Sequence, residues 1–155
     1  PYYLTYKSKQ IGYEPKVILS GRKMNDAMSK YVSDKVISSL RKKYKIINNK
    51  KVLILGFTFK ENCRDVRNTR VFEIYKNLKL KNIKVDIFDP LVDEKDAYKY
   101  YKIKLLNKLP KNKYNLILIA VGHKNFKKIK NNYFSGSILF DLKSIKKNLD
   151  PEFSF

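Results

Sequence analysis

The chain has 155 residues, the length of one ordinary domain or of one domain with part of another. Its 43% hydrophobic content, with 12 tyrosines and 9 phenylalanines, suffices for a packed core and excludes global disorder despite 32% charged residues. The formal charge of +21 rests on 35 basic residues, of which only five are arginine, and the lysines are scattered through every segment, which weakens a nucleic-acid interpretation of the charge.

The first third of the chain predicts helices. Residues 2–10 can form a short helix, which the turn at residues 12–15 ends because it contains a glycine and a proline. A long amphipathic helix then runs to about Tyr44, and its apolar residues recur every four positions at Met24, Met28, Val32, Val36 and Leu40. The polar stretch 47–51 marks a boundary, so we expect one unit over 1–48 and a second over 49–155.

The second unit alternates strands and helices. Four short apolar runs predict strands at 51–57, 83–90, 114–122 and 137–142. Helical spacing between them predicts helices at 70–82, 93–101 and 123–130. This order predicts an α/β fold, a Rossmann-like parallel sheet with helices on both faces, preceded by the long helix from a helical central domain.

Ligands of such sheets bind outside the carboxyl ends of the strands. That rule selects residues 57–70, 89–90, 122–123 and 141–144. A dinucleotide turn needs several glycines, whereas Gly56 is alone after the first strand, so this domain is not expected to bind NAD by itself in the usual way. Side chains could still hold phosphates, since Lys60, Arg64, Arg67 and Arg70 follow that strand.

The amino-acid sequence of this region resembles that of one protein family. The stretch VLILGFTFKENCRDVRNTRVFEIYKNLK, followed by VDIFDPLVD, resembles the C-terminal domain of the UDP-glucose/GDP-mannose dehydrogenase family. The nearest branch is that of the bacterial UDP-N-acetylhexosamine 6-dehydrogenases of surface-polysaccharide biosynthesis. Residues 1–32 resemble the end of the central helical domain of that family, including the Asn25-Asp26 pair. The resemblance covers nearly the whole chain.

The resemblance implies an oxidoreductase. Enzymes of this family oxidise the C6 hydroxyl of a nucleotide sugar to a carboxylate in two NAD-dependent steps, through a cysteine-bound intermediate. Because the chain starts at Pro1, just past the segment that holds the family's nucleophile, we expect a piece of a longer protein. The catalytic cysteine, its partners and the NAD-binding fold would lie outside it. We expect the piece alone to be inactive and the full-length form to be a homodimer supported by the long helix.

The resemblance also assigns binding residues. It implies that Phe59 and Lys60 lie at the nucleotide-sugar site and that Lys143, where many relatives have arginine, contacts the substrate. Arg67 matches an arginine that reaches the NAD bound on the opposite domain, and Asp65 fits as the partner that orients it. No catalytic residue and no metal site are assigned within this chain.

Several other residues receive no functional role. Cys63 has no histidine near it in sequence to activate the thiol. His123, the single histidine, shows no partner and is interpreted as structural, and Asp89-Pro90 as the end of a strand and the start of a turn. We interpret the apolar stripe of the long helix as packing. Arg64 and Arg70 stay unexplained.

Nothing in the sequence indicates a membrane or an export route. No apolar run approaches the roughly 18 to 20 residues that span a bilayer, and no signal-peptide pattern opens the chain. The lone cysteine excludes an internal disulfide and fits a reducing compartment, so we expect a cytoplasmic protein.

Two alternatives stay open beside the substrate-capping domain of a dehydrogenase. One is an independent basic module that binds nucleic acid or an anionic surface. The other is a noncatalytic scaffold that contributes only to subunit assembly. The identity of the UDP-sugar also stays open, because most contacts to the sugar would come from outside this chain.

Overall fold

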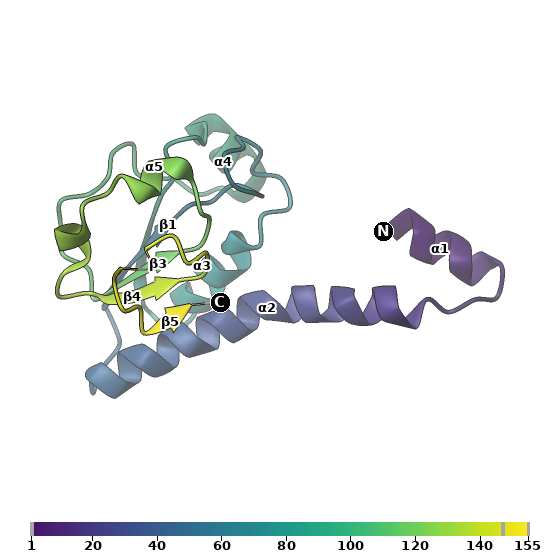
Figure 1. Cartoon of the computed structure of the whole chain (residues 1–155), viewed down its shortest axis with the longest axis horizontal. Helices are drawn as coiled ribbons and strands as arrows, with labels where there is room; N and C mark the ends of the chain where they lie inside the picture. Colours follow the sequence, from purple (N-terminus) through teal and green to yellow (C-terminus); the bar gives the residue numbers. More distant parts are fainter. Residues whose placement is uncertain (1, 147, 155) are drawn as a thin grey trace.

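The computed structural model describes residues 2–146 and 148–154. Its centre is a five-stranded parallel sheet in the order β2-β1-β3-β4-β5 (Figure 1). The strands are β1 (Lys51–Leu55), β2 (Lys84–Phe88), β3 (Leu116–Ile119), β4 (Ile138–Asp141) and β5 (Phe153–Ser154). The connections after β1 and after β2 run to opposite sides of β1, so the carboxyl ends of β1 and β3 form the topological switch point of this doubly wound sheet.

Each face of the sheet buries one half of the alternating strand residues. Val52 and Ile54 of β1 face one core cluster, which is covered by α2 (Lys16–Lys43), α3 (Val71–Lys79) and α4 (Glu94–Tyr101). Leu53 and Leu55 face the other cluster, covered by α5 (Lys124–Lys127) and the 3₁₀ helix η1 (Asn131–Phe134). The predicted Rossmann-like sheet with helices on both faces is therefore confirmed.

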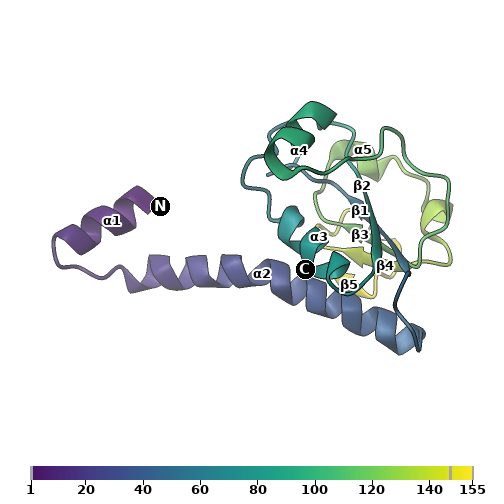
Figure 2. The ribbon, with the colours of Figure 1, turned by 180° about the vertical axis from the view of Figure 1, so that it is seen from behind.

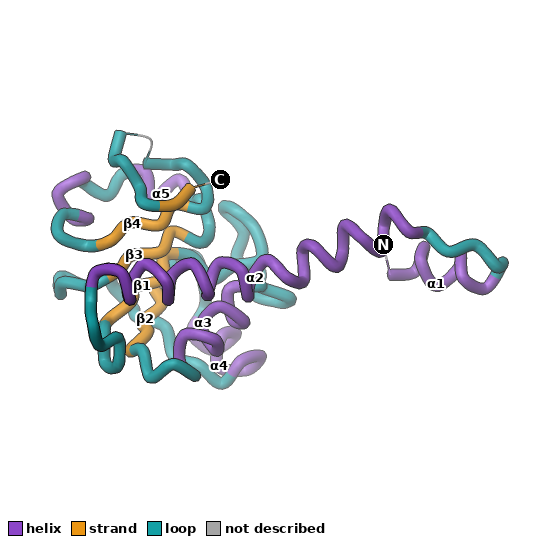
Figure 3. Tube along the Cα trace, turned by 90° about the horizontal axis from the view of Figure 1, so that it is seen from below, coloured by secondary structure: helices purple, strands orange, loops and turns teal. Residues whose placement is uncertain are grey.

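The long helix α2 is half inside and half outside the globular body. Its second half crosses the sheet beside α3, whereas its first half projects away and leads back to α1 (Tyr2–Gln10) (Figures 2 and 3). Within the described residues, neither this helix nor any other is long and apolar enough to cross a membrane.

The buried stripe of α2 differs from the predicted one. Val32, Val36 and Leu40 are buried as expected, but Met24 is 70% exposed and Met28 is 38% exposed. Residues four positions apart on an α-helix point in directions that differ by about 40°. Over several such steps toward the N-terminus, the side chains therefore rotate away from the buried face of the helix. Ser29 lies on that face instead and is buried. The interpretation of the whole stripe as packing is wrong for its first half within this chain.

Smaller elements were missed or were shorter than predicted. Strand β5 has two residues and η1 has four, too few for a periodic pattern. Strand β1 ends at Leu55 rather than at residue 57, because the next residue leaves extended conformation. Phe57 is buried although it lies beyond the last hydrogen-bonded residue of β1, so the apolar run in the sequence is longer than the strand.

The turn after β1 explains its single glycine. Gly56 has φ +94°, in the region that favours glycine, and a Cβ there would lie 2.5 Å from Cβ of Val121 and 2.9 Å from its backbone N. Val121 follows β3, so the loops at the switch point are in direct contact. This glycine serves close packing of two strand ends.

We predict that Gly56→Ala lowers the free energy of unfolding by about 3 kcal/mol, because it combines a strained φ with a clash against backbone. Gly136→Ala is the matched control. Gly136 has φ +82° but nothing within 4 Å of a new Cβ, so only about 1 kcal/mol is expected. Urea unfolding of both variants measures the difference, and equal losses would contradict the contact with Val121.

Candidate functional site: a cleft at the carboxyl ends of the strands

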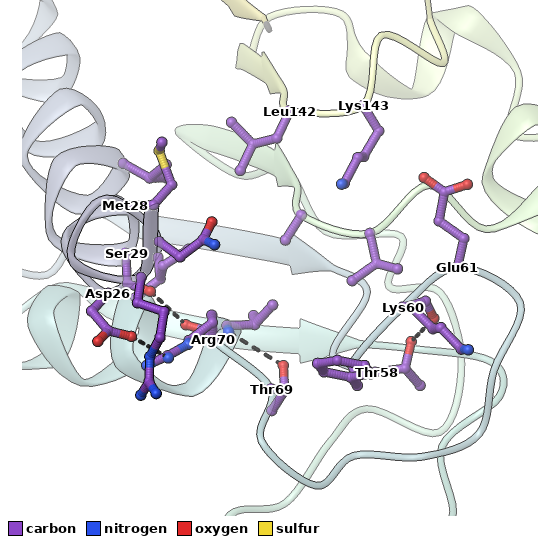
Figure 4. Close-up of a pocket in the computed structure, with 18 residues that line it drawn as sticks. Asp26, Met28, Ser29, Thr58, Lys60, Glu61, Thr69, Arg70, Leu142 and Lys143 are labelled. Carbon is purple, nitrogen blue, oxygen red and sulfur yellow. Dashed lines mark hydrogen bonds and ion pairs between the residues drawn. The ribbon is translucent and has the colours of Figure 1, made fainter. Parts of the chain in front are cut away.

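A cleft of about 980 Å³ lies between α2 and the carboxyl ends of β1, β3 and β4. Phe59, Lys60 and Lys143, the three residues assigned to the substrate, all line it. Figure 4 shows Lys60, Glu61 and Lys143 along one side and residues of α2, including Asp26, along the other. The structure thus brings Lys143 to the same cleft as Phe59 and Lys60, which precede it by more than 80 positions in sequence.

The loop after β1 buries the side chains of Phe57 and Thr58 and exposes those of Phe59 and Lys60. The Thr58 hydroxyl donates to the carbonyl oxygen of Lys60 at 3.0 Å, and the Phe59 N–H donates to the carbonyl of Asp65 at 2.8 Å. Phe59 is 58% exposed although it is aromatic, and its ring is available for stacking. The loop therefore offers an aromatic ring next to a lysine in one cleft.

Lys60 and Lys143 are both exposed cations. Within residues 2–146 and 148–154, neither side chain has a hydrogen-bond or ion-pair partner. An ammonium group without a protein partner can bind the oxygens of an anion without first breaking an internal ion pair. The cleft holds two such groups from separate loops.

The carboxylate of Asp89 is buried directly behind the β1 loop. Its Oδ2 accepts from the backbone N–H groups of Phe57 at 2.7 Å and Thr58 at 3.2 Å, and its Oδ1 accepts from Leu91 N–H at 2.9 Å. Burial alone would raise the pKa of Asp89, but hydrogen bonds from His123 and from backbone N–H groups hold the pKa below its ordinary value. The prediction that Asp89-Pro90 ends a strand and shapes a turn is confirmed.

His123 has the partners that the sequence did not show. Its side chain is 0% exposed, Nε2 lies 2.9 Å from Oδ2 of Asp89, and Nδ1 accepts from the backbone N–H of Asn62 at 2.9 Å. Because Nδ1 accepts, the hydrogen-bond pattern assigns the proton to Nε2, which donates to Asp89. The ring thus joins the loop after β3 to the loops after β1 and β2.

A second buried aspartate forms the turn that carries Lys143. Asp141, at the end of β4, accepts from the N–H of Lys143 at 3.1 Å and from the N–H of Lys146 at 2.8 Å. The neighbouring loop comes close: a Cβ on Gly122 would lie 2.8 Å from Oε1 of Glu61 and 3.1 Å from Cβ of Lys143. A side chain at Gly122 would require the flexible end of Glu61 to move and would pack tightly against Lys143.

Arg67 lies on the same loop but does not line the cleft. Its guanidinium donates to both carboxylate oxygens of Asp65, with Nη2 2.8 Å from Oδ2 and Nε 3.0 Å from Oδ1. These hydrogen bonds lower the pKa of Asp65 to about 2 and raise the pKa of Arg67. The predicted pairing is confirmed, whereas the contact of Arg67 with NAD stays a prediction.

Arg70, unexplained by sequence, has a structural partner. Its guanidinium forms an ion pair with Asp26 of α2, and its carbonyl oxygen accepts from the Ser29 hydroxyl at 3.1 Å. These contacts fix the start of α3 against α2 at the edge of the cleft. Arg64 is exposed and has no hydrogen-bond or ion-pair partner in the described part of the chain. The half-buried Cys63 accepts a hydrogen bond from the N–H of Asp65 at 3.4 Å, within the turn.

Sequence reasoning missed two contributions to the cleft. Glu61 places a carboxylate beside the two lysines, and the α2 residues Arg22 and Asp26 form the opposite wall. Glu61 directly follows Lys60, so its position next to the predicted site was the available signal. The wall from α2 had a weaker signal, the Asn25-Asp26 pair, because nothing in sequence shows that α2 lies beside the strand ends.

Residues 53–148 match the UDP-binding domain of the UDP-glucose/GDP-mannose dehydrogenase family. The chain belongs to this family. The match covers most of β1, all of β2, β3 and β4, and the loops that carry Phe59, Lys60 and Lys143, so the resemblance deduced from the motif is confirmed.

Named relatives agree with the hexosamine branch. The chain is 45% identical over 150 residues to a UDP-N-acetyl-D-glucosamine 6-dehydrogenase of Salmonella typhi, covering 94% of this chain and 35% of the relative. It is 43% identical over 127 residues to a UDP-N-acetyl-D-glucosamine 6-dehydrogenase of Pseudomonas aeruginosa, covering 82% of this chain and 30% of that protein. The chain thus spans about a third of the length of these relatives.

A solved structure has the same architecture. The UDP-N-acetyl-mannosamine dehydrogenase Cap5O of Staphylococcus aureus superposes with a TM-score of 0.71 at 25% identity, over 99% of this chain and 34% of its own. The superposition includes the helices α1 and α2 as well as the sheet, since nearly the whole chain is covered.

We predict that Asp89→Asn lowers the free energy of unfolding at pH 7 by roughly 3 kcal/mol, because an amide cannot accept all the hydrogen bonds of the carboxylate. The folded-state pKa of Asp89 is lowered, so its contribution is present above the unfolded value of about 3.9 and is lost as the pH falls below about 4. Urea unfolding at pH 7 and at low pH measures this loss, which the variant should lack.

Asp34→Asn is the control for that experiment. Asp34 pairs with Lys30 on the exposed surface of α2, and such pairs contribute about 0.5 kcal/mol. A variant at Asp89 that is no less stable than the one at Asp34 would refute the role of the buried carboxylate.

Proposed function

We propose that this chain is the C-terminal part of an NAD-dependent nucleotide-sugar 6-dehydrogenase that acts in polysaccharide biosynthesis. The substrate would be a UDP-N-acetylhexosamine, or UDP-glucose, oxidised to the uronic acid with two NAD. The observation that carries the proposal is the cleft, in which Phe59, Lys60 and Lys143 meet in a chain of the UDP-binding-domain family.

The side chains of the cleft suit a nucleotide sugar. Lys60 and Lys143, which have no hydrogen-bond or ion-pair partner among the described residues, can hold diphosphate or sugar oxygens. The exposed ring of Phe59 can stack on a base or pack on a sugar. The task of this domain is then to bind the substrate, orient it and cover it. Oxidation itself, by hydride transfer to NAD, and the catalytic cysteine belong in this proposal to the rest of the enzyme.

The turn after β1 does not fit a dinucleotide. Val121 fills the space at Gly56 that a pyrophosphate would need, and the N–H groups of Phe57 and Thr58 donate to Asp89 instead of facing outward. We therefore assign NAD mainly to another domain, with Arg67 contributing across the domain cleft. The Asp65 carboxylate would fix the direction of the Arg67 guanidinium.

The remaining assignments follow from the same proposal. We assign residues 1–48 to the end of a central helical domain and residues 49–155 to the substrate domain. A homodimer in the cytoplasm, with α2 at the subunit contact, fits the exposed apolar residues on the first half of that helix. The family match does not support the nucleic-acid alternative, which would require binding to DNA that weakens steeply with salt.

We predict that Lys60→Ala in the complete enzyme lowers kcat/KM for the UDP-sugar by roughly 10- to 100-fold, because a charge-assisted contact to the substrate is lost. Steady-state assays of NADH formation with varied UDP-sugar measure this. Lys79→Ala, at an exposed lysine on the last turn of α3, should leave the kinetics unchanged. Unchanged kinetics for Lys60→Ala would eliminate its proposed role.

We predict that Arg67→Ala raises the KM for NAD about tenfold and leaves the KM for the UDP-sugar unchanged, since one charge-assisted contact is worth about that much. Arg64→Ala, on the same loop, is the control and should change neither KM. If NAD kinetics were unaffected by Arg67→Ala while dimer formation depended on α2, the scaffold alternative would be favoured instead.

A further inference from the structure

We infer that His123 is a positioning residue for the nucleotide sugar: its buried ring fixes the loop that presents Phe59 and Lys60 to the cleft. This inference rests on the proposed function, because it needs Lys60 to contact the substrate. The ring itself is fully buried and does not line the cleft.

The loop is held at both of its ends by one buried pair. At its start, the N–H groups of Phe57 and Thr58 donate to the carboxylate of Asp89. At its end, the N–H of Asn62 donates to Nδ1 of His123, which bonds to the same carboxylate through Nε2. The three residues between these points, at positions 59–61, all have side chains that line the cleft.

The middle of the loop is tied to the same ring. Nε2 of His123 also lies 3.1 Å from the Thr58 hydroxyl, which donates its own proton to the carbonyl oxygen of Lys60. A continuous path of hydrogen bonds therefore runs from Asp89 through His123 and Thr58 to the backbone of Lys60. A displacement of the His123 ring would therefore displace the backbone of Lys60.

Asn62, at the end of the loop, has a strained backbone conformation that hydrogen bonds must stabilise. Asn62 has φ +54°, which costs energy for any residue with a side chain, although asparagine tolerates it better than most. Its side-chain oxygen accepts from the N–H of Lys124 at 3.0 Å, while its own N–H donates to His123. Two bonds to adjacent residues of the β3 loop thus clamp this one position.

The ring nitrogens of His123 link the N–H of Asn62 to the carboxylate of Asp89. An apolar ring in place of His123 would fill the volume and keep the contact with Phe126, whose centroid lies 5.3 Å away. It would leave the Asn62 N–H without its acceptor and Asp89 without one donor. The loop would then sample other conformations, so the substrate would bind more weakly even where the fold survives.

The test uses the complete enzyme with two substitutions at this position. His123→Phe should raise the KM for the UDP-sugar on the order of tenfold, equivalent to about one hydrogen bond, with little change in kcat and in the KM for NAD. His123→Asn keeps an acceptor oxygen near the place of Nδ1 and should recover much of the lost affinity. A thermal unfolding midpoint is recorded for each variant.

Two further variants keep the inference testable if His123→Phe does not fold. Asn62→Gly retains the left-handed conformation but removes the bond to Lys124, at an exposed position, and should raise the same KM by a smaller factor. Phe126→Leu disturbs the neighbouring core without touching the hydrogen bonds. An equal rise in KM for Phe126→Leu would show general destabilisation and overturn the inference.

Hydrogen exchange separates this inference from the proposed function. In the wild-type enzyme the N–H of Asn62 should be protected, and His123→Phe or, failing that, Asn62→Gly should increase its exchange and that of Phe57 and Thr58. Unchanged exchange overturns the inference whatever the enzyme oxidises. An enzyme that shows the expected exchange but oxidises no UDP-sugar refutes the proposed function instead.

Discussion

The buried carboxylate of Asp89 is the constraint on which the cleft depends. A charge out of contact with water must be satisfied by several donors, and this one takes N–H groups from two loops and a histidine from a third. Meeting that requirement fixes the backbone of Phe57 and Thr58, where the chain leaves β1. Lys60, which lines the cleft, thus follows a stretch of backbone that is held by a network that does not itself line the cleft.

The same network distinguishes this strand end from the glycine-rich turn that binds dinucleotides. In a glycine-rich phosphate turn, backbone N–H groups point toward the ligand. Here the corresponding N–H groups of Phe57 and Thr58 point inward to Asp89, and Val121 occupies the space beside Gly56. Because these two backbone donors are bonded to Asp89, they are not available to an anion, whereas the side chain of Lys60 on the same loop lines the cleft.

The sequence predicted what depends on local pattern and missed what depends on distant contacts. Buried apolar runs predicted four of the strands and the sheet type, and the motif around Lys60 predicted the family. The partners of His123 could not be predicted, because Asp89 lies 34 residues away and Asn62 lies 61 away. The exposed first half of α2 was missed because periodicity shows that a helix has an apolar face but not whether the rest of the domain reaches it.

The cations of this very basic chain differ in whether they have an ion-pair partner and in whether they line the cleft. Arg70 is neutralised by Asp26 and serves the packing of two helices, and Arg67 is directed by Asp65. Lys60 and Lys143 stand on turns whose backbone is held by buried aspartates, yet their own ammonium groups have no partner among residues 2–146 and 148–154. Arg64 also has no hydrogen-bond or ion-pair partner in the described part of the chain, but it does not line the cleft. Position in the cleft, together with the lack of a partner, is therefore what suits Lys60 and Lys143 to hold an anion.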